Sequence, residues 1–305
     1  MNSYHMYRNK QDIGKRIRYL HSEEPLSVAL IAADYGTVLI DAISYYESKF
    51  SSPLYVLIFE DMGNITGLRM NFPSVSFIVF TQPVSVGNMI NVMANECFTT
   101  YFFVTRSDVH VIDFNFEEIL NQFNKVDKPA LITPVIMNKA DEYIPVVQVP
   151  RMEQHIIDPL PFFPTKEKEA TLYPYLGLGV YERALFQRLR GFDELLVGEY
   201  WQFLDFGVRC WLFGYTIWIL SSLTLKFPFR QLVIENRSET ESIKRILTKA
   251  LGVRQVNGKN YPRRIGKYTD PSYLNSEMKK RIALYKCDFN ELMSEWIAPI
   301  VEEDE

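Results

Sequence analysis

Acidic side chains collect where three short apolar runs of this 305-residue chain end. The acids at these three points are Asp34, Glu60 with Asp61, and Asp108. If the runs are parallel strands, these carboxylates lie at the carboxyl edge of a sheet, which is where open α/β sheets bind ligands. Carboxylate oxygens there can accept hydrogen bonds from ligand hydroxyl groups. The alternative for Asp34 and Asp61 is a helix N-cap or a turn residue, and the sequence leaves both roles open.

The elements that would position these acids alternate between strands and helices. The apolar runs 27–33, 54–59, 75–80 and 99–104 are too short for helices and predict strands covered on both faces. In the stretches between these runs, apolar residues recur at helical spacing, for example in the stretch that contains Gly87. This alternation predicts an α/β fold with a mostly parallel, Rossmann-like sheet and helices on its faces.

Further along, the chain predicts a helix over 114–123, a strand over 130–137, an apolar helix over 200–213 and closing strands over 216–220 and 232–235. Pro134 inside the second of these elements indicates a sheet edge or a bulge. The Pro-rich stretch 145–169 predicts a long loop over the domain. Lys226, after the closing strand over 216–220, is most simply a surface residue.

Shifts in composition predict three parts: an N-terminal lead-in (1–23), an α/β domain (24–235) and a helical C-terminal extension (236–305). We expect helices over 12–20, 238–251 and 275–296, an irregular basic stretch over 253–267 and an acidic tail over 302–305. A capping-box pattern, Ser238-x-x-Glu241, marks the start of the second helix.

Composition excludes several kinds of protein. The net charge of −4 argues against a nucleic-acid binder, which usually carries a basic surplus. The three cysteines are widely spaced and the four histidines lack metal-ligand spacing. No signal peptide is evident, and no apolar run reaches the roughly 18 residues that a membrane span needs. We therefore expect a cytoplasmic protein, with the inner face of the membrane as an open alternative.

Two motifs carry a resemblance to a known family. Gly87 and Asn91 on a predicted helix, followed by Tyr101 in a strand and Asp108 after it, are similar in spacing to the family 2 glycosyltransferases. The motif Gly191-Phe-Asp-Glu194 matches the G-F-D-E of that family. The resemblance implies a GT-A fold.

The resemblance also implies roles for residues. Asp34 and Asp61 would hold the nucleotide of a nucleotide-diphosphate sugar. Asn91 and Arg106 would also bind this donor. The metal position, Asp108, would hold a Mg or Mn ion. The acceptor would lie at Asp193 and Glu194. Arg106 stands where the family has an acid, so it is either a solvated loop residue or a fixed cation beside the diphosphate.

The general base is the second departure from the family. The Glu-Asp pair of the family would fall on Gln202 and Phe203, which cannot accept a proton. The nearby acids Glu199 and Asp205 are the remaining candidates. The alternative for Asp205 is an ion pair with Arg209, four residues on, and for Glu199 a charge that stabilises a helix N-terminus.

The expected function is transfer of a sugar from a nucleotide-diphosphate donor, UDP-type first, to a glycan or lipid-linked acceptor in polysaccharide biosynthesis. Inversion at the anomeric carbon is what the resemblance implies. The alternative is a catalytically degenerate binding or scaffolding subunit. A nucleotidyltransferase is disfavoured, because the first strand is followed by Asp34-Tyr-Gly36 rather than a glycine-rich loop that ends in Arg. Peripheral membrane contact and a homo-oligomer stay open.

Overall fold

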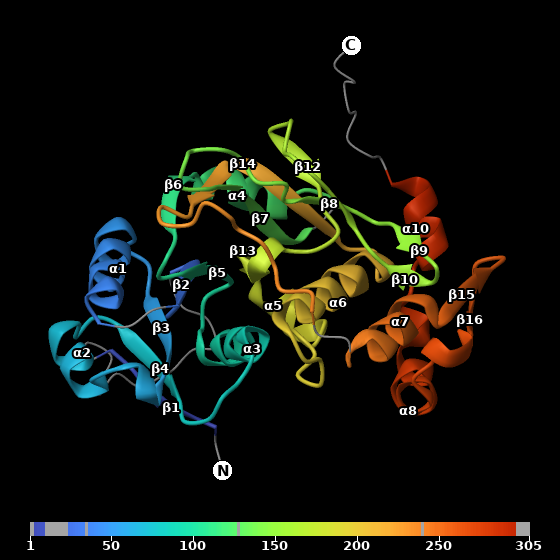
Figure 1. Ribbon diagram of the computed structural model, residues 1–305, viewed down its shortest axis with the longest axis horizontal. Coiled ribbons are helices and arrows are strands. Elements are labelled where there is room, and N and C mark those ends of the chain that lie inside the picture. Colours follow the sequence, from blue (N-terminus) through green and yellow to red (C-terminus); the bar gives the residue numbers. More distant parts are fainter. Residues whose placement is uncertain (1–2, 10–23, 34–35, 127–128, 239–240, 297–305) are drawn as a thin grey trace.

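A computed structural model describes residues 3–9, 24–33, 36–126, 129–238 and 241–296 (Figure 1). One half of its main sheet is parallel. The strands of this half, in spatial order, are β4 (Ser76–Phe80), β3 (Leu54–Phe59), β2 (Leu26–Ile31) and β5 (Tyr101–Arg106). These match the four predicted runs, so the mostly parallel α/β sheet is confirmed.

The other half of the sheet is mixed. The short strand β13 (Gly179–Glu182) runs antiparallel between β5 and β7 (Pro129–Met137). The long strand β14 (Thr216–Lys226) is parallel to β7, and β12 (Lys168–Ala170) and β6 (His110–Phe114) pair with it antiparallel. The predicted strand over 232–235 is wrong, because β14 continues to Lys226 and the residues after it form no strand.

Pro134 lies in the middle of the sheet, not at its edge. It pairs with Leu220, and the register of β14 then shifts so that Thr224 faces Val135. The extra residues of β14 bulge out opposite a proline that has no N–H to donate. Of the two predicted alternatives, the bulge is therefore correct.

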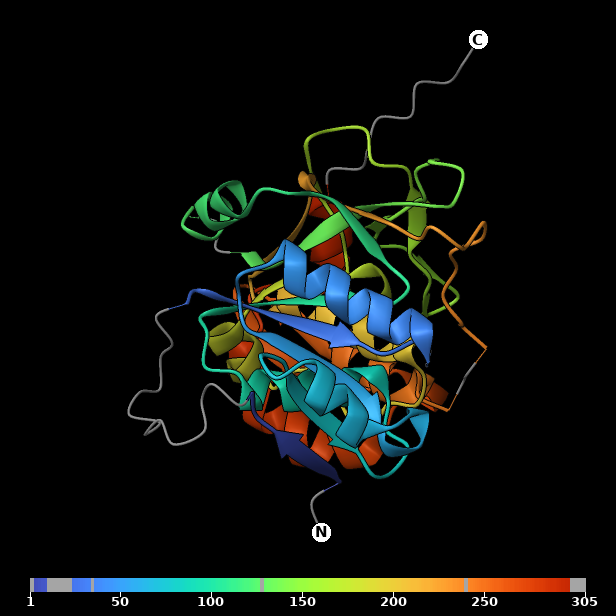
Figure 2. The same ribbon diagram turned by 90° about the vertical axis from the view of Figure 1, so that its left-hand side faces the viewer.

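Two hydrophobic cores cover the faces of the sheet. Along β2, Val28 and Leu30 point into one core, while Ala29 and Ile31 point into the other. The first core is closed by α1 (Thr37–Lys49), α2 (Ile65–Asn71) and α4 (Phe116–Phe123). The second is closed by α3 (Val86–Glu96), α5 (Arg183–Arg188) and α6 (Glu199–Leu212). Figure 2 shows α1 in front of the strands and roughly aligned with them, with the C-terminal elements on the far side of the sheet.

The N-terminal lead-in contributes a strand that the sequence did not predict. Residues Tyr4–Tyr7 form β1, which pairs antiparallel with β4 at the edge of the sheet. The predicted helix over 12–20 lies outside the described residues.

The stretch 145–169 is built of short paired strands instead of an open loop. They are β8 (Val147–Val149) with β11 (Leu160–Phe162), and β9 (Met152–Glu153) with β10 (Ile156–Ile157).

The C-terminal extension differs from its prediction in three places. Its first helix, α7 (Ile243–Leu251), begins after Ser242, so the capping box predicted at Ser238 does not start it. The basic stretch 253–267 contains a hairpin of β15 (Val253–Val256) and β16 (Lys259–Pro262). The predicted helix over 275–296 is interrupted, because residues 285–288 are not helical.

Short helical turns and a final helix complete this extension. They are α8 (Pro271–Tyr273), a π-helical turn (Leu274–Met278), α9 (Lys279–Arg281) and α10 (Phe289–Glu295). Their buried residues belong to the same core as α6, so the extension packs on the domain. The acidic tail lies outside the described residues. Within the described ranges, no helix is long and apolar enough to cross a bilayer.

Candidate functional site

A hollow of about 540 Å³ opens at the carboxyl ends of β3 and β4. Residues 59–62 and 80–83 line it, and Asp61 lies there on the short 3-10 turn that follows β3. This is the edge at which a ligand of an open α/β sheet is expected. The structure therefore places Asp61 where the sequence predicted it, while Asp34 lies outside the described residues.

Asp108 lies at the same edge, directly after β5, and is buried. Its Oδ1 accepts a hydrogen bond of 3.1 Å from Arg106 Nε, and its Oδ2 forms an ion pair with Arg230. The Ser107 hydroxyl accepts a hydrogen bond of 2.8 Å from the Ala33 amide, which joins the ends of β2 and β5. Arg230 comes from the segment after β14, and no sequence motif pointed to it.

This donor set does not fit a divalent metal ion. Mg and Mn prefer several oxygen ligands, whereas both oxygens of Asp108 face guanidinium groups. Among the described residues, no three His, Cys, Asp or Glu side chains are grouped to hold a metal. Lys226, the last residue of β14, forms an ion pair of 2.5 Å with Asp141. Within the described part of the chain, the predicted Mg or Mn site at Asp108 therefore finds no supporting ligand set.

Glu199 is the first residue of α6 and lies near this cluster. The preceding Gly198 has a φ of 88°, a left-handed conformation that turns the chain sharply into the helix. Part of Glu199 is open to solvent, but desolvation raises the pKa of its carboxyl group, while the nearby Arg106 lowers it. A carboxylate with a raised pKa is suited to accept a proton.

A second acid, which the sequence did not single out, is Glu235. Its carboxylate accepts hydrogen bonds from the Tyr173 hydroxyl at 2.7 Å and from the Leu176 amide at 2.9 Å. Burial raises its pKa to about 7, and the charge of Glu199 adds to the rise. Arg237, two residues on, stacks over the Tyr200 ring at 4.6 Å. Glu235 thus anchors the segment that carries Arg230.

Asp205 faces away from this cluster. Its Oδ2 accepts a hydrogen bond of 2.8 Å from Arg209 Nε, and its Oδ1 lies 2.7 Å from Lys249 Nζ. The residue is 1% exposed. Both carboxylate oxygens of Asp205 are engaged by cations inside the core, so these contacts do not support its predicted role as the base, and the predicted ion pair with Arg209 is present.

Asp193 of the Gly191–Glu194 motif serves the same buried network. It forms ion pairs with Arg245, at 2.6 Å, and with Lys249. Burial acts to raise the pKa of Asp193, but these two cations hold it below its ordinary value. Glu194 is exposed beside it, in the lining of a polar hollow of about 470 Å³. These contacts do not support acceptor binding by Asp193, and the role of Glu194 stays a prediction.

Asn91 makes structural contacts with the Gly191–Glu194 motif, and its cofactor-binding role stays a prediction. Its Nδ2 donates to the Phe192 carbonyl and its Oδ1 accepts from the Phe192 amide, both at 2.9 Å. A Cβ on Gly191 would meet Asn91 Oδ1 at 2.2 Å, and one on Gly87 would meet Gln202 Oε1 at 2.4 Å. The two glycines therefore allow α3, α6 and the motif to approach closely.

The fold is similar to that of GT-A glycosyltransferases, as the sequence resemblance implied. The crystal structure of GalNAc-T7 with UDP, GalNAc and Mn2+ matches with a TM-score of 0.60 and 12% identity, over 90% of this chain and 57% of that one. The chain thus spans little more than half the length of GalNAc-T7. TarS of S. aureus matches with a TM-score of 0.44 and 15% identity, over 67% of this chain and 36% of that one.

At these identities the likeness shows the fold alone. No family model matches the sequence, and no curated protein matches it either.

Proposed function

We propose that this protein is a glycosyltransferase that moves a sugar from a nucleotide-diphosphate donor to a glycan or lipid-linked acceptor. The supporting observation is that one edge of the sheet carries both the hollow at Asp61 and the cluster of Arg106, Asp108 and Arg230. UDP is the first nucleotide to test, because the GalNAc-T7 structure contains it. The expected location, the cytoplasm or the inner face of the membrane, would suit a lipid-linked acceptor.

In this proposal the donor lies along the sheet edge. The nucleoside occupies the hollow after β3 and β4, where the Asp61 carboxylate can accept hydrogen bonds from ribose hydroxyls. The diphosphate lies towards the end of β5. There the guanidinium groups of Arg106 and Arg230 match phosphate oxygens, while the buried carboxylate of Asp108 holds both cations in place.

The transfer step needs one proton acceptor and one set of cations. Glu199 takes the proton from the acceptor hydroxyl, and the resulting oxygen attacks the anomeric carbon opposite the diphosphate. The new carbon–oxygen bond forms as the bond to the diphosphate breaks, so the configuration inverts. Arg106 and Arg230 stabilise the charge that develops on the leaving diphosphate. The donor set at Asp108 does not fit a metal, so no step is assigned to one.

Nucleotide binding tests this proposal. Thermal shifts and calorimetry with UDP, GDP, TDP, CMP and their sugars, with and without Mn2+, should identify one diphosphate nucleoside that binds. We expect Arg106→Ala and Arg230→Ala to weaken that binding about tenfold or more, because each removes a charge-assisted contact. Arg254→Ala, at an exposed position on β15, is the matched control. If no nucleotide binds, the enzyme proposal is wrong.

A degenerate binding subunit is the second candidate. The observation that favours it is that Gln202 and Phe203, at the positions of the family base, are both buried in α6. A protein of this kind would bind a nucleotide sugar without releasing its diphosphate in the presence of any acceptor. Measuring diphosphate release from the donor that binds therefore distinguishes the two candidates.

A further inference from the structure

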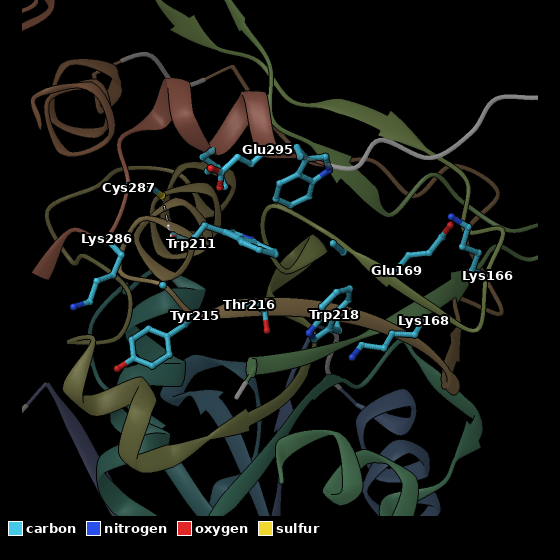
Figure 3. Close-up of a pocket in the computed structure, with 14 residues that line it drawn as sticks. Lys166, Lys168, Glu169, Trp211, Tyr215, Thr216, Trp218, Lys286, Cys287 and Glu295 are labelled. Carbon is cyan, nitrogen blue, oxygen red and sulfur yellow. Dashed lines mark hydrogen bonds between the residues drawn. The ribbon is translucent and has the colours of Figure 1, made fainter. Parts of the chain in front are cut away.

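A pocket of about 590 Å³ lies at the opposite end of β14 from Arg230 (Figure 3). It opens where β14 begins, between β12, the end of α6 and α10. From Trp218 in the pocket to Lys226 near Arg230, β14 runs beside β7 from Ile132 to Met137, which is roughly 17 Å of strand. The function proposed above does not use it. Its volume lies within the range of small-ligand sites.

Aromatic side chains form the walls of this pocket. Figure 3 shows Trp211 on one side and Trp218 with Tyr215 on the other. Trp296 also lines the pocket and packs against Trp211, with ring centroids 4.6 Å apart at 63°. Trp211 Nε1 donates a hydrogen bond of 3.0 Å to the Thr171 carbonyl, which fixes its ring. Flat apolar faces are thus held in place before any ligand arrives.

Charged groups surround these walls. Lys166, Lys168 and Lys286 line the pocket with Glu169 and Glu295. Lys168 Nζ lies 4.0 Å from the Trp218 ring centroid. Glu169 is buried and accepts hydrogen bonds from Thr165, whereas Glu295 is exposed at the rim. The pocket therefore offers both donors and acceptors around an aromatic interior.

This combination matches the chemistry of a sugar ring. A pyranose has faces of C–H groups that stack on electron-rich aromatic rings, and its hydroxyl edge both donates and accepts hydrogen bonds. An acyl chain would leave the charged rim without polar partners. A polyanion would be repelled by the two glutamates, which offsets its attraction to the three lysines.

We propose that this pocket is a second carbohydrate-binding site, which holds a unit of an oligosaccharide away from the reaction centre. Sugar binding there does not depend on transferase activity. Its use in retaining a glycan acceptor does rest on the function proposed above.

Calorimetry and tryptophan fluorescence on the full chain test the proposal. The probes are short soluble oligosaccharides derived from chitin, cellulose, starch and galactan. We expect saturable binding of at least one of them, weakened about tenfold or more by Trp218→Ala, which removes a stacking face. Lys168→Ala, a change at the rim of the pocket, should weaken oligosaccharide binding as well. This variant keeps the test decisive if Trp218→Ala fails to fold. Tyr261→Ala, at an exposed aromatic residue on β16, should leave it unchanged.

UDP binding is measured in the same samples and reports on the separate donor edge. Loss of sugar binding with UDP binding retained in Trp218→Ala would support the proposal even if no transferase activity is found. The proposal is overturned if no oligosaccharide binds, if the pocket variants bind as the wild type does, or if only detergent or lipid vesicles compete for the pocket.

Discussion

Lys249 and Asp205 form a buried ion pair of 2.7 Å that joins α7 of the C-terminal extension to α6 of the α/β domain. Both side chains are almost excluded from solvent, at 3% and 1% exposure. Lys249 also pairs with Asp193, so the same ammonium group neutralises two carboxylates. The extension is therefore tied to the Gly191–Glu194 motif by charge as well as by apolar packing.

We predict that Lys249→Met destabilises the protein by about 1–3 kcal/mol. The substitution keeps the volume of the side chain and leaves Arg209 on Asp205 and Arg245 on Asp193, but the buried Oδ1 of Asp205 loses its cation and Asp193 loses one of its two. Urea unfolding followed by circular dichroism measures the loss. The control is Lys244→Met on the exposed face of the same helix, which should change the free energy of unfolding by about 0.5 kcal/mol or less. Equal losses in the two variants would refute a buried role for Lys249.

Asn91 gives the second prediction. Asn91→Ala removes two hydrogen bonds to the Phe192 backbone and should cost about 1–3 kcal/mol, because it leaves buried polar groups without partners. Asn95→Ala, on an exposed position of the same helix, should cost less. Calorimetric UDP binding should be unchanged in Asn91→Ala. A selective loss of UDP affinity in a stable variant would support the cofactor-binding role that the sequence suggested.

The parallel half of the fold could be predicted from local sequence because each of its strands is an apolar run bounded by polar breaks. Residues 54–59 form a strand over the predicted range. The strand β1 could not be predicted, since four residues with little burial form a strand only by pairing with β4. The hairpin of β15 and β16 was not predicted for a similar reason, because its strands are short and mostly exposed.

The site was only partly predictable. Asp61 and Asp108 could be found because each follows a recognisable strand. Arg230 and Glu235 lie in a segment without regular structure, and only the tertiary fold brings them to Asp108 and Tyr173. The spacing of Gly87 and Asn91 brings α3 close to α6 and to the Gly191–Glu194 motif, a packing role that the sequence did not reveal.

Glu199 gives the third prediction. Glu199→Gln should lower kcat by about 10²–10⁴-fold, the usual range for loss of a general base, with little change in donor binding. Because the pKa of Glu199 is raised, the wild-type rate should fall on the acid side at a higher pH than an ordinary glutamate would give. Glu117→Gln, at an exposed position on α4, is the control. An unchanged kcat and acid limb in Glu199→Gln would exclude it as the base.

Glu235 gives a prediction about the pH dependence of stability. Burial raises its pKa from 4.5 to about 7 in the folded protein. Between these values the folded protein keeps a proton that the unfolded chain has released. The contribution of Glu235 to the free energy of unfolding is therefore fully present below about pH 4.5 and is lost as the pH rises to about 7. The loss is at most about 3 kcal/mol.

Urea unfolding at several pH values, compared between the wild type and Glu235→Gln, measures this contribution. Glutamine keeps an oxygen to accept from Tyr173 and Leu176, but it cannot titrate. The difference between the two stability curves should therefore change between about pH 4.5 and 7 and stay constant above. Glu117→Gln, at an exposed position on α4, should give a curve parallel to the wild type. If the Glu235→Gln curve is parallel as well, the Glu235 carboxyl titrates at the same pH in the folded and unfolded chain. The segment that carries Arg230 would then be held by a carboxylate that stays ionised across this range.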